Sequence, residues 1–322
     1  MTKNGVTMKD VAKKACVTTQ TVSRALGGGS VNPETRKRII KIAEQLGYIK
    51  NSSASALRSG RAKMVAVLYD DPRNLFFPLM TDFLQDHFQK KGYMILTIAV
   101  KKQQMDMETY NLSLSQNVSG IVTYLEPTEE FDTPIVGKKL PMLLFGRHTE
   151  STNFDCLEFD DRLGGTLAAN RLLHEDGCKK VLYVTAGTSI SCFNRRFDGF
   201  KSVIDEAKDV EYEVVDVTEI SEKLDALDKN NALPDGVFCF SDMSAMTVLS
   251  WFDGKGKHAP KVVGFDDLSG EVPLPCRLTS IGADKNEMAK CAVDILLNRM
   301  NGAKGPCVRE TMPVYLTEGT TG

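Results

Sequence analysis

The 322-residue sequence has no apolar run of about 18 residues, so it predicts no membrane-spanning helix. Its first residues, MTKNGVTMKD, lack the apolar segment of a secretory signal peptide. The eight cysteines form no CxxC pair, which argues against a zinc ribbon and a thioredoxin-like site. We expect them to be small buried hydrophobic residues in a reducing compartment. These absences predict a cytoplasmic protein with no membrane partner.

Motifs of common catalytic and nucleotide-binding sites are also absent. The four histidines are scattered, and there is no HExxH, no GxSxG, no Walker A and no GxGxxG after a predicted strand. We therefore expect no enzyme, no catalytic residue, no metal and no cofactor. The glycines of GGTLAAN, residues 164–170, are expected to allow close packing.

The charge that is present is unevenly distributed. Residues 1–63 contain 13 Lys and Arg against 3 Asp and Glu, whereas residues 64–322 contain 27 against 39. A basic segment joined to an acidic body is typical of a polyanion-binding module attached to a second functional unit. The alternative is a solvated basic surface with no binding role.

Residues 7–47 carry the start and stop signals of three short helices. Each predicted helix follows a polar N-cap residue: Thr7, Thr18 and Asn32. Glycines at 27–29 predict a loop between the second and third helices. The apolar faces are expected to bury Val11, Ala12, Ala15, Val22, Ala25, Leu26, Ile39, Ile40, Ile42, Ala43 and Leu46. Two short helices joined by a tight turn and closed by a third predict a helix-turn-helix.

The second predicted helix, residues 19–26, has polar side chains suited to reading DNA. It presents Thr19, Gln20, Ser23 and Arg24 on one side. Gln and Arg can form paired hydrogen bonds with adenine and guanine edges, each pair worth about 1–3 kcal/mol of discrimination. The alternative is a small helical domain whose polar face meets only water.

The stretch MKDVAKKACVTTQTVSRALGG, followed by VNPETRKRIIKIAEQLGY, resembles the N-terminal signature of the lactose-repressor (LacI/GalR) family of bacterial transcription regulators. The resemblance is dense over residues 7–63 and continues more loosely to the C-terminus. It implies a set of DNA-binding residues in this segment, namely Thr7, Thr18, Thr19, Gln20, Thr21, Ser23, Arg24, Asn32 and Tyr48.

Residues 51–63, within IKNSSASALRSGRAK, form a short and serine-rich segment. The resemblance implies a hinge helix that folds when two copies pair on DNA, with Leu57 wedged into the minor groove. Ala54 would support the paired helices, and Asn51 is assigned to the same DNA-binding set. Lys50 stands where family members often have proline. From the residues alone, a flexible linker is an equal alternative.

From residue 64 onward, short apolar runs alternate with helical patterns. Two such series predict two α/β lobes with parallel sheets, and a ligand site beyond the strand C-termini. The resemblance implies a periplasmic-binding-protein-like core, with the last strand, near 308–317, in the second lobe. The predicted domains are an all-α helix-turn-helix domain at 1–50, a hinge or linker at 51–63 and a two-lobed core at 64–322. Within the core, lobe 1 is predicted at about 64–161 and 282–304, and lobe 2 at about 162–281 and 305–322.

The resemblance also implies an effector site between the lobes. Arg196, in CFNRRFDGF, could chelate two hydroxyls or a carboxylate, and Asp266, in VVGFDD, would accept from sugar hydroxyls. The complete predicted set is Phe76, Phe77, Asp160, Phe193, Arg196, Ser241, Asp242 and Asp266. Structural roles are the alternatives, because the phenylalanines could be core residues, Arg196 an ion-pair partner and Asp242 a helix N-cap.

Residues 217–220, VTEI, lack the stacking aromatic that several relatives have there, so a platform for a sugar ring would come from elsewhere, such as Phe193. The mixture of Arg and Asp favours a neutral or weakly charged polyol.

These features predict a homodimeric, sequence-specific regulator, a repressor, that binds a pseudopalindromic operator in double-stranded DNA. A sugar-like small-molecule effector would control it. The first alternative is a family member controlled mainly by a protein partner, like the catabolite-control protein. The second is an enzyme or sugar-binding module with an incidental basic segment, which would lack steeply salt-dependent DNA binding.

Overall fold

The computed structural model describes residues 6–27, 29–48, 63–133, 140–187 and 190–322. The chain divides into two compact units, Met1–Ala62 and Lys63–Gly322, which we call the head and the core. The predicted hinge residues Asn51, Ala54 and Leu57 lie outside the described residues, so their roles stay predictions.

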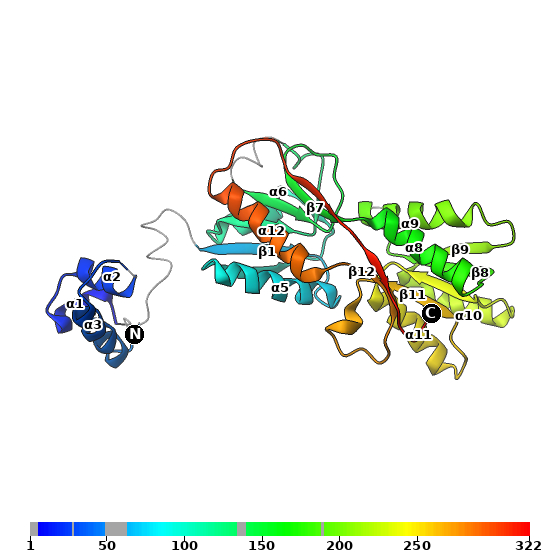
Figure 1. Cartoon of the computed structure of the whole chain (residues 1–322), viewed down its shortest axis with the longest axis horizontal. Helices are drawn as coiled ribbons and strands as arrows, with labels where there is room; N and C mark the ends of the chain where they lie inside the picture. The colour runs from blue at the N-terminus through cyan, green and yellow to red at the C-terminus, as the bar shows by residue number, and fades with distance from the viewer. Residues whose placement is uncertain (1–5, 28, 49–62, 134–139, 188–189) are drawn as a thin grey trace. The chain divides into compact units, whose positions relative to one another are not determined.

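The described part of the head consists of three helices, α1 (Met8–Ala15), α2 (Thr19–Leu26) and α3 (Pro33–Gln45) (Figure 1). The predicted N-caps are all present. The Asp10 carboxylate accepts from the backbone N and the hydroxyl of Thr7, at 2.8 and 2.6 Å. The Thr18 hydroxyl accepts from the backbone N of Thr21 at 3.1 Å, and Asn32 Oδ1 accepts from that of Glu34 at 3.0 Å. Local capping therefore fixes where each helix begins.

The small core of the head confirms most of the predicted apolar faces. Val11, Val22 and Ile39 are fully buried where the three helices meet. Ile40 was predicted to be buried, but 38% of it is exposed. The reason is geometric: successive residues of a helix point about 100° apart, and Ile39 occupies the inward position.

The first lobe of the core is built on a six-stranded sheet with all neighbours parallel. Its strand order is β13 (Arg309–Met312), β7 (Asp155–Phe159), β6 (Met142–Phe145), β4 (Gly120–Thr123), β1 (Met64–Tyr69) and β2 (Met94–Ala99). Beside it, β3 (Gln104–Met105) pairs with β5 (Glu126–Pro127). The helices of this lobe are α5 (Phe76–Lys90), α6 (Met107–Ser115) and α12 (Lys285–Met300).

The second lobe repeats the plan with one antiparallel edge strand. The order is β14 (Tyr315–Thr317), β12 (Thr279–Gly282), β11 (Lys261–Phe265), β10 (Gly236–Cys239), β8 (Lys180–Thr185) and β9 (Glu211–Asp216). The accompanying helices and turns are α8 (Asp161–Asn170), η1 (Arg171–Glu175), α9 (Ser191–Ile204), η2 (Val217–Glu219), α10 (Ile220–Lys229), α11 (Asp242–Gly254) and η3 (Leu268–Gly270).

The predicted position of the last strand is partly wrong. Residues 309–312 were expected in the second lobe, but β13 pairs in parallel with β7 and extends the sheet of the first lobe. Only β14 joins the second sheet, antiparallel to β12. The β13 pairing covers the edge of β7 that would otherwise be open, so the chain returns to the second lobe between residues 312 and 315 rather than near 305.

Both sheets of the core are covered by helices on their two faces (Figure 1). The strands are buried accordingly: Val65, Val67 and Leu68 of β1, and Val237 and Phe238 of β10, are fully inaccessible to solvent. Across the ranges that the structure describes, each helix is too short or too polar to cross a bilayer. Of the eight cysteines, four are buried as predicted, whereas Cys16 is exposed and Cys276, Cys291 and Cys307 are half-buried.

Candidate functional site

Helix α2 presents the side chains that the sequence assigns to DNA reading. Thr19, Gln20 and Arg24 are exposed, and Ser23 is half-buried, while Val22 on the other side packs into the head core. The helix is thereby anchored by its apolar side and free on its polar side. Thr7, Thr18 and Asn32 of the predicted set have their side chains engaged in helix capping, and Tyr48 packs against the head core.

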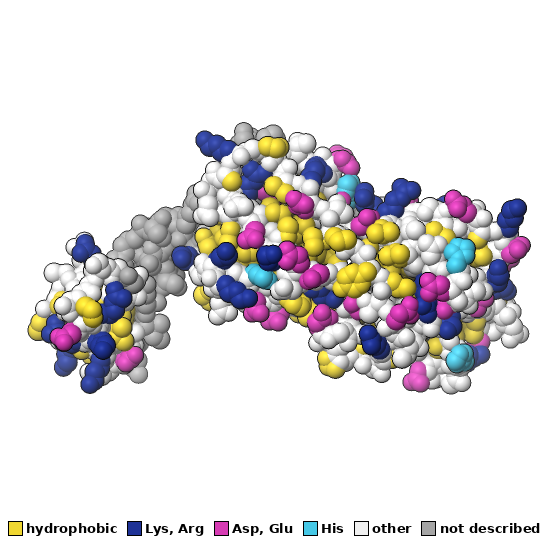
Figure 2. Space-filling view, viewed as in Figure 1, with side chains coloured by type: hydrophobic (Ala, Val, Ile, Leu, Met, Phe, Trp, Pro, Cys, Tyr) yellow, Lys and Arg dark blue, Asp and Glu magenta, His cyan; other side chains and the backbone are white. Residues whose placement is uncertain are grey.

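All three helices of the head carry exposed cations. They are Lys9, Lys13, Lys14, Arg24, Lys37, Arg38 and Lys41. Figure 2 shows lysine and arginine side chains spread over the visible face of this unit. An exposed helix with Gln and Arg, within a strongly basic unit, is suited to contact phosphates and base edges together.

The core has a cavity of about 220 Å³ between its two lobes. The first lobe lines it with residues that follow β1 and β6, and the second lobe with residues of α9 and the ends of β10 and β11. Of the predicted effector residues, Phe76, Phe77, Phe193, Arg196, Ser241 and Asp266 line it. The cavity lies where parallel strands end, the usual ligand position in open α/β sheets.

Arg196 is the most constrained polar side chain of the cavity. Only 4% of the residue is exposed. Its Nε donates to Asp161 Oδ1 at 2.7 Å, its Nη1 donates to the Phe240 carbonyl at 2.5 Å, and its guanidinium carbon lies 3.4 Å from the centroid of the Phe265 ring. The ion pair foreseen as an alternative therefore exists, with Asp161 as partner. Arg196 is at once a structural residue of the second lobe and a residue of the cavity wall.

Asp266 directly follows β11 and has an uncommon backbone conformation. Its φ is +114°, a region that residues other than glycine rarely occupy. Its backbone N donates to the Ile281 carbonyl at 2.7 Å, which holds this turn against β12. Burial raises the pKa of the Asp266 carboxyl well above its ordinary value, although nearby Arg196 opposes the shift. The group is thus biased toward the protonated form, which can donate a hydrogen bond into the cavity.

Two predicted effector residues, Asp160 and Asp242, are not among the cavity-lining residues. Asp160 Oδ1 caps α8 by accepting from the backbone N of Leu163 at 3.0 Å. Asp242 is fully buried, and its two oxygens accept from the backbone N of Leu268 at 2.7 Å and the Ser280 hydroxyl at 2.6 Å. Both carboxylates are engaged in structural hydrogen bonds, so the structure gives no support for an effector contact.

Ser241 lines the cavity, but its hydroxyl accepts from the backbone N of Ser244 at 3.2 Å as the N-cap of α11. Phe76 and Phe77 have a similar double position. They line the cavity while their ring centroids lie 6.1 and 4.9 Å from that of Tyr124, in an aromatic cluster under it.

Raising the pH from 5 to 7 is expected to lower the free energy of unfolding of the core in the parent protein. The decrease should exceed that in Asp242→Asn by up to about 2 kcal/mol. Burial raises the Asp242 pKa to about 7, against about 3.9 when unfolded. The folded state therefore holds a proton that the unfolded state releases, so stability falls as pH rises from about 4 to about 7 and then levels off.

Urea unfolding of both proteins at pH 5, 6, 7 and 8 would test this. The Asp242 charge also helps to raise the Asp266 pKa, so the difference between the two proteins reports Asp242 together with its effect on Asp266. Parallel stability profiles for the two proteins would contradict the role given to Asp242.

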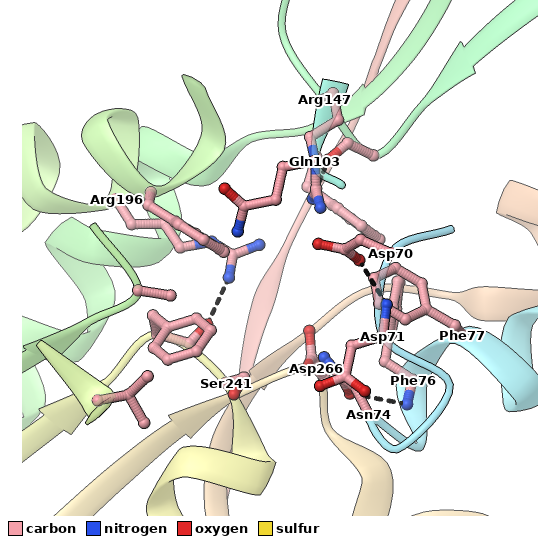
Figure 3. A pocket seen from close by; sticks show the side chains of 16 residues that line it. Asp70, Asp71, Asn74, Phe76, Phe77, Gln103, Arg147, Arg196, Ser241 and Asp266 are labelled. Carbon is pink, nitrogen blue, oxygen red and sulfur yellow. Dashed lines mark hydrogen bonds between the residues drawn. The ribbon is translucent and has the colours of Figure 1, made fainter. Parts of the chain in front are cut away.

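The sequence reasoning missed several polar residues of the cavity. Asp70, Asp71, Asn74, Gln103 and Arg147 all line it, and Figure 3 shows Arg147, Arg196, Gln103, Asp70 and Asp266 around one space. A signal was available for three of them, because Asp70 and Asp71 directly follow β1 and Arg147 follows β6 by one glycine. Within the described ranges, no three His, Cys, Asp or Glu side chains are grouped as metal ligands.

Hydrogen bonds join the two lobes beside the cavity. Ser191, which begins α9, donates from its backbone N and its hydroxyl to Glu126 Oε1 of the first lobe, at 2.8 and 2.5 Å. The backbone N of His148, also in the first lobe, donates to the Ser191 hydroxyl at 3.0 Å. The start of α9, one turn before Arg196, is therefore fastened to the first lobe.

A basic helix-turn-helix unit, joined in one chain to a two-lobed core with an interlobe cavity, defines a class of DNA-binding regulators. Family models support both parts. Residues 7–51 match the bacterial regulatory proteins of the lacI family, and residues 171–321 match the periplasmic binding protein-like domain. The chain belongs to the lacI family of bacterial regulatory proteins and is a DNA-binding transcription regulator.

Relatives and solved structures agree with this assignment. The chain is 26% identical over 311 residues to the HTH-type transcriptional repressor PurR of Aliivibrio salmonicida, covering 91% of this chain and 92% of that protein. It is 26% identical over 316 residues to the ribose operon repressor of Haemophilus influenzae, with 91% and 92% covered. The lac repressor dimer bound to operator and the anti-inducer ONPF superposes with a TM-score of 0.80 at 21% identity, covering 99% of each chain. These curated relatives are transcriptional repressors rather than enzymes.

Proposed function

We propose that this protein is a cytoplasmic repressor that binds a pseudopalindromic operator as a homodimer and responds to a sugar-like small molecule in the interlobe cavity. The observation that carries the proposal is the polar face of α2. Gln20 and Arg24 are exposed on a helix whose other side is anchored, within a unit of high positive charge. The two repressors named above, one of a ribose operon, support the assignment of regulation and of ligand class.

Two heads of a dimer would place two copies of α2 in successive major grooves, so operator symmetry would mirror protein symmetry. Gln20 and Arg24 would read bases, and the surrounding lysines would contact phosphates. The segment from Asn51 to Leu57 would fold as a paired hinge helix on the DNA, with Leu57 entering the minor groove.

Ligand control requires that the effector bind the DNA-competent and DNA-incompetent states with different affinity. The cavity residues come from both lobes, so a bound ligand would favour one relation between the lobes. In the proposed dimer, a changed relation of the first lobes would alter the distance between the hinge segments. The hinge would then lose or gain its paired partner, and operator affinity would change.

Gln20→Ala and Arg24→Ala are each expected to lower discrimination between operator and mismatched DNA by about 1–3 kcal/mol, since each removes one paired hydrogen-bonding side chain. The measurement is binding to a selected operator and to single-mismatch versions, from 50 to 200 mM salt. Lys9→Ala is the control, because it removes an exposed cation without a reading role. It should weaken all sequences alike and reduce the salt slope. Unchanged selectivity in both α2 variants, or salt-independent binding by the parent, would overturn the proposal.

A further inference from the structure

Arg147 is a buried cation at the junction of the two lobes. It follows β6 of the first lobe, and only 7% of the residue is exposed. Its Nη1 lies 3.2 Å from the Gly146 carbonyl and 3.3 Å from Cys192 Sγ, and Cys192 belongs to α9 of the second lobe. Its guanidinium carbon lies 5.8 Å from the Phe193 ring centroid, also on α9. Arg147 thus reaches across the cavity wall from one lobe to the other.

The charge of Arg147 differs from that of Arg196 in how it is compensated. Arg196 pairs with the buried Asp161, whereas among the described residues no carboxylate forms an ion pair with Arg147. Burial opposes the charge of Arg147, but Cys192, Asp70 and Glu126 outweigh burial and raise the Arg147 pKa. None of these carboxylates contacts the guanidinium, since Asp71 pairs with Arg73 and Glu126 accepts from Ser191. The charged form of Arg147 is therefore maintained in the cavity wall, and its direct contact position is open to an anionic group of a ligand.

The two arginines approach the same aromatic ring from different lobes. The Arg196 guanidinium carbon lies 5.7 Å from the Phe193 centroid, nearly the same distance as that of Arg147. Figure 3 shows both guanidinium groups facing the space that Gln103 also faces. Two like charges this close to one ring repel each other across the lobe junction. An anion placed between them would remove this repulsion and connect the lobes.

We propose that the effector is a polyol of monosaccharide size that carries one anionic group, a carboxylate or a phosphate, held between Arg147 and Arg196. Guanidinium groups bind both anions through paired N–H donors. This inference rests on the proposal that the interlobe cavity is the effector site. The ligand differs from the neutral or weakly charged polyol that the sequence predicts, because Arg147 adds a second cation to the cavity.

The rest of the cavity suits the hydroxyl groups of such a ligand. Asp266 is biased toward its protonated form and can donate, Asp70 can accept, and the amide groups of Asn74 and Gln103 offer both donors and acceptors. The cavity volume of about 220 Å³ lies below the ~300–1,000 Å³ of sites for drug-sized ligands. This size favours one sugar unit over a disaccharide.

The test uses the full chain and matched probes. D-glucose, D-gluconate and D-glucose 6-phosphate, with D-ribose, D-ribonate and D-ribose 5-phosphate, differ within each series in the anionic group. Inorganic phosphate is added as an anion without a polyol. Thermal shift and calorimetry are expected to show at least one acid or phosphate ester binding roughly 10- to 100-fold more tightly than its neutral parent. Tighter binding of the sugar acid would identify a carboxylate as the anionic group, and tighter binding of the phosphate ester would identify a phosphate.

Three variants identify the residue responsible. Arg147→Gln is expected to remove the preference for the anionic probe, and Arg147→Lys to retain part of it, since Lys keeps the charge but loses the planar fork. Arg195→Gln is the matched control, because Arg195 is the neighbour of Arg196 on α9, is not among the cavity-lining residues and lies 3.9 Å from Glu158. It should keep the parental preference. Urea unfolding followed by Trp251 fluorescence verifies that the core of each variant is folded, and operator binding without ligand verifies its head.

Tighter binding of a neutral sugar than of its acid and ester, unaffected by Arg147→Gln, would overturn the inference and leave the cavity as the effector site. No response to any probe, in a protein that still binds its operator, would also overturn it. Loss of sequence-specific DNA binding in the parent would be a failure of the proposed function, and the operator measurement detects it separately.

Discussion

Arg196→Met is expected to lower the free energy of unfolding of the core by about 3–5 kcal/mol, the cost of leaving one partner of a buried ion pair unpaired. The partner, Asp161, is fully buried, and no described residue donates a hydrogen bond to its Oδ2. Burial raises the Asp161 pKa, while Arg196 is the main influence lowering it. Without Arg196, the carboxyl would have to be protonated or solvated, and either change opposes folding.

The chain contains a convenient reporter for this measurement. Its single tryptophan, Trp251, lies on α11 of the second lobe, the lobe that holds Arg196 and Asp161. Urea unfolding followed by its fluorescence should give a lower midpoint for Arg196→Met. The double variant with Asp161→Leu should recover most of the loss, because replacing both members of a buried pair by apolar residues is often neutral or stabilising.

Arg73→Met is the matched control for an exposed pair. Arg73 contacts Asp71 at 2.9 Å, but 89% of its side chain is exposed, so its removal should cost less than about 1 kcal/mol. If Arg196→Met were as stable as Arg73→Met, the buried pair would not hold the second lobe together. Arg196 is also expected to be needed for the effector response. The double variant should recover stability without recovering Arg196, so it separates loss of the ligand contact from loss of folding.

The head was largely predictable from its sequence because its structure is set locally. The N-caps at Thr7, Thr18 and Asn32 and the spacing of the apolar residues each act within one or two turns. Ile40 shows the limit of this reasoning, since two consecutive isoleucines cannot both face a narrow core. The alternation of strands and helices likewise predicted two lobes, but not that β13 pairs with β7, because that choice depends on which strand edge is open.

The family resemblance predicts eight effector residues, and six of them, Arg196 and Asp266 included, line the cavity. The resemblance predicts Asp160 and Asp242 as well, but hydrogen bonds to neighbouring backbone decide where those carboxylates point. Arg147 was missed because its importance comes from the second lobe, and contact with Cys192 and Phe193 appears only when the two lobes are assembled.

Gly165→Ala is expected to destabilise the core by about 3 kcal/mol, at the upper end of the overpacking range. Helices α8 and α9 pack with their backbones in contact at this point. A β-carbon on Gly165 would overlap the carbonyl oxygen of Arg196 and lie 2.8 Å from the backbone N of Phe200. Gly199 on α9 has the reciprocal relation to the Arg162 carbonyl of α8. Backbone atoms cannot rotate away as side chains can, so the helices must separate.

Gly254→Ala is the control, because that position on α11 has no neighbour within 4 Å of an added β-carbon. The same change there should be neutral or stabilise by up to about 1 kcal/mol. Trp251 fluorescence reports both variants, and equal stability would refute the close α8–α9 contact. Since α9 carries Cys192, Phe193 and Arg196, separating the helices should also displace the cavity wall. Gly165→Ala should therefore lose effector response while keeping the selectivity of α2 for operator DNA, because the head has its own core.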